Sequence, residues 1–149
     1  MVKEMNGKND NVSLLSHIKK TTDEAILGIN NLEEKIKQSK FKEQIKSYKV
    51  EYQRIVDEVK EVLTKYGQTE KEISSLKRAT HNIVSNAKTI KGESSSNISK
   101  ILIGESKQYI KSIRKELYQD ALYDEEIVKL AEKFITITEE MIEELKAYL

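Results

Sequence analysis

Four glutamates lie close together near the end of the chain, at Glu139, Glu140, Glu143 and Glu144. Carboxylates at helical spacing are the ligands from which helical bundles build di-iron and di-manganese centres. The same spacing also produces the solvated outer face of an amphipathic helix. The choice between a metal site and a surface depends on which way this helix faces.

The surrounding residues favour the surface interpretation. Phe134, Thr138, Met141 and Leu145 recur at steps of three or four residues and define the inward stripe of a helix. Successive helical residues turn by about 100°, so each glutamate projects roughly 90° or more from the centre of that stripe. We therefore expect all four glutamates to face solvent.

Metal ligands inside a bundle must come from the inward positions of its helices. Six inward positions of the stripes are the ones at which such ligands would be sought: Thr22, Tyr52, Ile55, Ser106, Thr138 and Met141. None of them is a carboxylate or an imidazole, and Glu105 is the acid that leans furthest inward. His17 and His81 lack an acid or a second histidine one turn away that shares an inward face, so both are expected on the surface.

Four of these six inward positions instead carry hydroxyl groups. A buried carboxylate without a partner costs several kcal/mol, whereas a buried Thr or Ser can return its hydroxyl to the i−4 carbonyl. We predict a small buried polar cluster built by Thr22, Tyr52, Ser106 and Thr138. We expect no catalytic residue, no metal and no other cofactor.

Five helical segments position these side chains. Their apolar stripes run over about 12–36, 41–66, 69–91, 98–118 and from 124 to the end. Gly67 suits a helix C′ position, Thr69 and Glu72 have capping-box spacing, and Asp124 suits an N-cap. Strand signals are absent. The sequence predicts a single all-α domain over residues 12–149, after a flexible N-terminus at 1–11.

Composition limits the classes of function. The chain has 149 residues, a formal net charge of +1 and no cysteine. A protein that binds nucleic acid through phosphates usually carries a basic excess, and a membrane helix needs about 20 apolar residues in a row. We therefore expect a cytoplasmic protein with no nucleic-acid partner and no membrane insertion, whose partners are further copies of itself or other proteins.

Several segments resemble the ferritin-like superfamily. "LLSHIKKTTDEAILGI" resembles its first helix, with Thr22 where the family has a ligand glutamate, and "VEYQRIVDEVKEVLTKYG" is similar to its second. "SNISKILIGESKQYIKSIRKEL" and "EEIVKLAEKFITITEEMIEELKAYL" look like the last two helices of a small, largely uncharacterised bacterial branch. In the last of these, the family's Glu-x-x-His falls on Thr138 and Met141.

The resemblance implies an antiparallel four-helix bundle of ferritin-like type, with a crossover helix between its two hairpins at 69–91. The departures at the ligand positions argue against oxygen activation or iron oxidation. The expected function is a structural or protein-interaction module without metal or catalysis.

Two alternatives stay open from the sequence. The first is a di-iron or other metal-dependent oxidase whose helices are rotated from our assignment, with candidate ligands Glu24, Glu51, Glu58, Glu105 and Glu139. The second is a helical adaptor that docks a partner through Leu122 and Tyr123, in the connection between the last two helices.

Overall fold

The structure, a computed structural model, describes residues 2–76, 94–119 and 121–149. Every regular element in these ranges is a helix, which confirms the all-α class. No helix among them is long and apolar enough to cross a membrane. The elements are α1 (Val2–Glu33), α2 (Ser39–Lys65), α3 (Glu70–Ser74), α5 (Ser95–Leu117), α6 (Glu125–Leu145) and the 3₁₀ helix η1 (Lys146–Tyr148).

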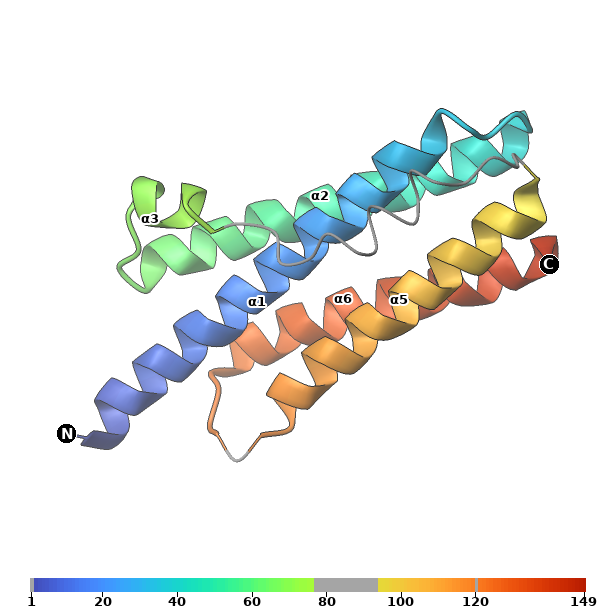
Figure 1. The fold of residues 1–149 in the computed structure, drawn as a ribbon. Helices are drawn as coiled ribbons and strands as arrows, with labels where there is room; N and C mark the ends of the chain where they lie inside the picture. The colour runs from blue at the N-terminus through green and yellow to red at the C-terminus, as the bar shows by residue number, and fades with distance from the viewer. Residues whose placement is uncertain (1, 77–93, 120) are drawn as a thin grey trace.

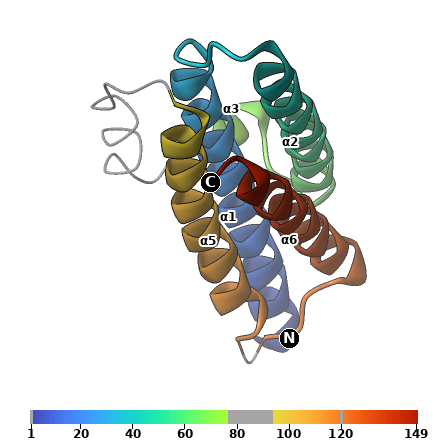
Figure 2. The same ribbon diagram turned by 90° about the vertical axis from the view of Figure 1, so that its right-hand side faces the viewer.

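The four long helices lie side by side (Figures 1 and 2). α1 contacts α2, α5 and α6, and α6 also contacts α2 and α5. α1 and α6 run in one direction, while α2 and α5 run in the other (Figure 1). α2 therefore ends at the opposite end of the assembly from the start of α5, and the chain from Leu76 to Ser94 joins these two ends.

One hydrophobic core lies between the long helices, and the predicted stripes supply it. Leu15, Ile18, Ile55, Ile98 and Phe134 are all fully buried. Burying a side chain of this size contributes roughly 1.5–3 kcal/mol, so a rotation that exposed one stripe would be strongly unfavourable. The predicted registers are confirmed at these positions.

The end of α2 and the start of α3 follow their predicted signals. Gly67 adopts a positive φ of 86°. Its N–H donates to the carbonyl of Thr64, and the N–H of Gln68 donates to the carbonyl of Leu63, which is a Schellman motif. Thr69 and Glu72 form the predicted capping box, each side chain accepting a hydrogen bond from the other residue's N–H.

Other boundaries differ from the sequence prediction. α5 begins at Ser95 rather than near Ile98, because the Ser94 hydroxyl accepts the N–H of Asn97 and caps the helix earlier. Asp124 holds the N-cap position of α6 but makes no side-chain cap bond. Its carboxylate instead accepts a hydrogen bond from the hydroxyl of Tyr66, the C-cap residue of α2.

The predicted third helix ends early. α3 stops at Ser74, with Ser75 as its C-cap, although the stripe continues at Leu76. The remainder of the predicted crossover helix, including His81, lies outside the described residues. At the other end of the chain α1 begins at Val2, so the segment 1–11, predicted as a flexible N-terminus, is helical from its second residue.

Candidate functional site

The predicted polar positions are buried, and two of them are bonded to each other. Tyr52 on α2 and Thr138 on α6 are both fully buried, and their hydroxyls lie 2.8 Å apart in a hydrogen bond. The Tyr52 ring also packs against Phe134, one turn before Thr138, with ring centroids 5.6 Å apart. Burial raises the pKa of Tyr52, so the phenol stays neutral.

The other two predicted residues make no hydrogen bond to this pair. The Thr22 hydroxyl donates to the carbonyl of Ile18 over 2.7 Å, the i−4 bond expected of a buried threonine. Ser106 is buried on α5. All four residues are therefore buried. Among them, in the part of the chain that the structure describes, only Tyr52 and Thr138 are hydrogen-bonded to each other.

A second polar group lies between α1 and α5. Glu24, Glu105 and Tyr109 are all at least nine-tenths buried. A Cβ atom on Gly28 would lie 3.0 Å from Oε2 of Glu105 and 4.0 Å from the Tyr109 hydroxyl, so both α5 side chains converge on this glycine. Glu24 lies one turn before Gly28 on α1. The missing Cβ thus leaves room for two polar side chains of α5.

The Glu105 carboxyl of this second group is held in an unfavourable environment. Burial, and then the charge of Glu24, raise the pKa of Glu105 to about 8. Burial and the neighbouring carboxyls also raise the pKa of Tyr109. Among the described residues, neither Oε1 of Glu105 nor the Tyr109 hydroxyl has a hydrogen-bond partner. Glu105 is therefore largely protonated at neutral pH.

The sequence prediction located only part of this group. It identified Glu105 as the most inward acid, but it considered Glu24 only as an acid that a rotated helix would bring inward. In the structure α1 buries Thr21, Thr22, Glu24 and Ala25 without any rotation. Its buried face is wide because α1 contacts α2, α5 and α6 at once. A narrow apolar stripe describes a helix that packs against two neighbouring helices. It does not include the residues of α1 that face a third helix.

The glutamates at the end of α6 face outward, as predicted. Glu139, Glu140, Glu143 and Glu144 are all exposed. Glu139 pairs with Arg114 at 3.1 Å and Glu143 with Lys146 at 2.7 Å. Glu144 accepts hydrogen bonds from Tyr48 and Gln44 on α2, which lower its pKa.

The residues present do not match the di-metal centre that the resemblance implies. Such a centre uses four carboxylates and two histidines that project inward. In the part of the chain that the structure describes, no three acids, histidines or cysteines gather closely enough to hold a metal ion. Of the five candidate ligands, only Glu24 and Glu105 are buried. Glu58 and Glu139 form ion pairs at the surface with Lys133 and Arg114.

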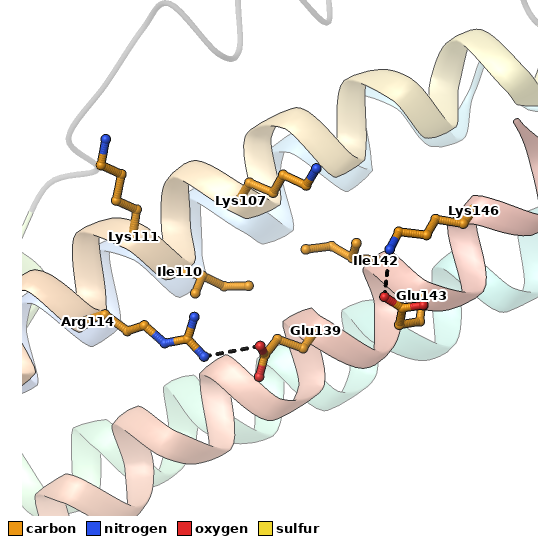
Figure 3. A pocket seen from close by; sticks show the side chains of 8 residues that line it. All are labelled: Lys107, Ile110, Lys111, Arg114, Glu139, Ile142, Glu143 and Lys146. Carbon is orange, nitrogen blue, oxygen red and sulfur yellow. Dashed lines mark hydrogen bonds and ion pairs between the residues drawn. The ribbon is translucent and has the colours of Figure 1, made fainter.

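The outer surface carries a groove between α5 and α6 (Figure 3). Its volume is about 590 Å³, and eight residues line it: Lys107, Ile110, Lys111, Arg114, Glu139, Ile142, Glu143 and Lys146. Figure 3 shows the two isoleucines between the helices, with the charged side chains around them. This groove combines a small apolar floor with charged walls.

The charges of the groove do not cancel. Four cations line it against two carboxylates, and the carboxylates already pair with Arg114 and Lys146. Lys107 and Lys111 are exposed on α5, and neither is paired with an acid of the described residues. Lys107 and Lys111 thus add two available ammonium groups to the lining of the groove, and the Lys111 side chain points away from α6 (Figure 3).

The connection between α5 and α6 shows which of its apolar residues is exposed. Tyr123 packs against the core and donates its hydroxyl to the carbonyl of Glu116 at 2.9 Å. Leu122 is 91% exposed. The proposed docking pair is therefore reduced to one exposed leucine.

Comparisons with known proteins give no identification. No protein-family model, no curated protein and no solved structure matches this chain.

Proposed function

We propose that the four long helices form a ferritin-like bundle that serves as a protein-interaction module. The helix directions support this topology. α2 and α5 run the same way, so their connection must pass from one end of the bundle to the other, as the crossover of that fold does. The inward hydroxyl pair of Tyr52 and Thr138 supports the proposed loss of metal chemistry, because these side chains satisfy each other.

The groove between α5 and α6 is the proposed interaction surface. The observation that carries this proposal is that two available lysines, Lys107 and Lys111, line the same groove as the isoleucine floor. Charge complementarity selects an acidic partner. The occupant we propose is an acidic amphipathic helix that places leucine-sized side chains over Ile110 and Ile142 and carboxylates against the lysines.

A synthetic helix tests this assignment. The probe is a fluorescein-labelled peptide of repeated Leu-Glu-Glu-Leu-Glu-Glu-Glu, titrated with the protein and followed by fluorescence anisotropy. We expect binding that weakens as salt is raised, because exposed charges are screened over about 10 Å at 0.1 M ionic strength. Lys107→Glu combined with Lys111→Glu should weaken the binding by about tenfold or more.

A matched variant separates the groove from general electrostatic attraction. Lys100 and Lys115 are exposed on the same helix but do not line the groove. Changing both to glutamate alters the net charge equally and should leave binding within about twofold. Equal loss in the two double variants, or no binding by the original protein, would contradict the proposed surface. Concentration-dependent self-association that both variants retain would show that a second copy uses another face.

A metal-dependent function is the second candidate, and the burial of Glu24 and Glu105 is the observation that favours it. Two carboxyls beside the Tyr109 hydroxyl provide oxygen ligands, although fewer than a di-metal centre needs. Metal analysis of the purified protein, with thermal unfolding in added Fe²⁺, Zn²⁺ and Mn²⁺, tests it. Bound metal that disappears in Glu105→Gln would support this candidate over the first. No bound metal and no shift in the unfolding midpoint would exclude it.

A further inference from the structure

A histidine at the surface bridges α1 and α5. Nδ1 of His17 lies 2.7 Å from Oε1 of Glu116, and its Nε2 lies 2.7 Å from Oγ of Ser112. Ser112 and Glu116 are four residues apart on α5, so they share one face of the helix. One imidazole thus lies between a hydroxyl and a carboxylate that come from a different element.

The carboxylate determines where the protons lie. An ionised carboxylate only accepts hydrogen bonds, so Nδ1 of the neutral imidazole must carry the proton that Glu116 accepts. Nε2 is then an acceptor, and the Ser112 hydroxyl must donate to it. This is the order of groups with which a histidine acts as general base toward a serine.

Neighbouring side chains hold this arrangement in place. Ser13, one turn before His17 on α1, donates to the other oxygen of Glu116 over 3.1 Å. The hydroxyl of Tyr123 donates to the Glu116 carbonyl at 2.9 Å. The side chains of His17 and Glu116 are only 26% and 17% exposed, whereas Ser112 is exposed. The base and its carboxylate are shielded, and the hydroxyl remains accessible from solvent.

We propose that Ser112, His17 and Glu116 form a nucleophile, a general base and a positioning carboxylate that hydrolyse small activated esters. The Ser112 oxygen bonds to the ester carbonyl carbon as its proton passes to Nε2 of His17. The bond from that carbon to the leaving oxygen then breaks, and the leaving group takes the proton from His17. Water, deprotonated by His17, attacks the acyl-serine, releases the acid and restores the Ser112 hydroxyl.

The helix limits the substrates to reactive esters. Ser112 lies in the interior of α5, so its N–H donates within the helix and is not available to a developing oxyanion. Losing one such donor costs about 10²–10³ in rate in enzymes that have it. Aryl esters with small acyl groups compensate because their leaving groups depart readily. The site is accordingly proposed for that chemical class.

Labelling and hydrolysis test the proposal on the full chain. A fluorophosphonate probe should form a bond from Ser112 Oγ to phosphorus with loss of fluoride, and peptide mass mapping should locate it at Ser112. With 4-nitrophenyl acetate we expect a burst of one nitrophenolate per chain. Ser112→Ala should abolish both signals, and His17→Gln should reduce the acylation rate by about 10²–10⁴.

A folding check and two further variants separate catalysis at Ser112 from unfolding and from reaction at other serines. Ser112→Ala is expected to fold, because alanine favours an exposed helical position, and circular dichroism checks this. Ser47→Ala removes an exposed serine that donates to the carbonyl of Gln44 and should change neither signal. Glu116→Gln can donate to Nδ1, which reverses the imidazole tautomer, so acylation should fall by about tenfold or more. A label on another residue, or an unchanged rate in Ser112→Ala, would overturn the proposal.

Discussion

The interior contains two polar groups that are equally buried and differently satisfied. Between α2 and α6, the hydroxyls of Tyr52 and Thr138 bond to each other. Between α1 and α5, Glu105 is close enough to Glu24 for that charge to raise its pKa, and the Tyr109 hydroxyl lies near the same glycine. The first group is neutral and paired, while the second contains acids.

The difference shows that burial alone does not determine what a polar group contributes. Two neutral hydroxyls that pair with each other replace the hydrogen bonds they lose to water. A buried acid keeps its proton at the expense of its charge, so its contribution depends on pH. The Tyr52–Thr138 bond between α2 and α6 should be insensitive to pH, and the Glu105 group between α1 and α5 should not.

The largest expected effect comes from Glu105→Gln. The raised pKa means that the folded chain holds this proton more tightly than the unfolded chain, whose ordinary glutamate pKa is 4.5. The stabilising contribution is fully present below pH 4.5 and is lost as the pH rises to about 8. We expect the variant to lie close to the original protein near pH 5 and to exceed it by about 4 kcal/mol at pH 9.

Urea unfolding at the two pH values measures this difference. Glu140→Gln is the matched control, because Glu140 is an exposed glutamate on α6, and its removal should leave the pH dependence unchanged. If Glu105→Gln and the original protein lose stability equally between pH 5 and 9, Glu105 does not make the α1–α5 polar group dependent on pH.

A smaller effect is expected from removing one hydroxyl of the neutral Tyr52–Thr138 pair. Tyr52→Phe leaves the Thr138 hydroxyl buried without its partner, and Thr138→Val does the same to Tyr52. Each should lower the free energy of unfolding by about 1–2 kcal/mol. The double variant removes both hydroxyls, so its loss should be clearly smaller than the sum. Additive losses in urea unfolding would mean that this hydrogen bond does not couple α2 to α6.

The smallest effect is expected from Thr22→Val. The Thr22 hydroxyl donates only to the carbonyl of Ile18 within its own helix. That carbonyl is also the i−4 acceptor for the helical N–H of Thr22, so valine leaves no buried group unsatisfied. The free energy of unfolding should change by less than about 0.5 kcal/mol. A loss comparable to that of Tyr52→Phe would show that Thr22 belongs to the same hydrogen-bonded group.

The helices could be predicted because their signals are local. The stripe through Phe134 and Leu145, the glycine stop at Gly67 and the capping box at Thr69 each depend on residues within a few positions. The outward direction of the four glutamates follows from the same periodicity. Asp124 shows the limit, because Tyr66 from another helix takes the carboxylate that would have capped α6.

For the polar contacts, the sequence predicts which residues are buried but not which residues they contact. Periodicity places Tyr52 and Thr138 inside, but it does not determine which helices are neighbours. Glu24 was expected inside only if α1 were rotated, whereas a third neighbour widens the buried face of α1 and buries it without rotation. His17 was expected to be an ordinary surface histidine, since its partners Ser112 and Glu116 lie 95 and 99 positions away. No local pattern connects residues at that separation.

The bond from Asp124 to Asn11 has a consequence for synthesis. The N–H of Asp124 donates to the buried Asn11 side chain over 2.9 Å, across 113 positions of sequence. A ribosome adds about 5–20 residues per second, so roughly ten seconds pass between the appearance of Asn11 and that of its partner. Until α6 is complete, the apolar stripe of the first hairpin lacks part of its core. The nascent chain therefore depends on its dense surface charge, or on a chaperone, to avoid association before α6 is complete.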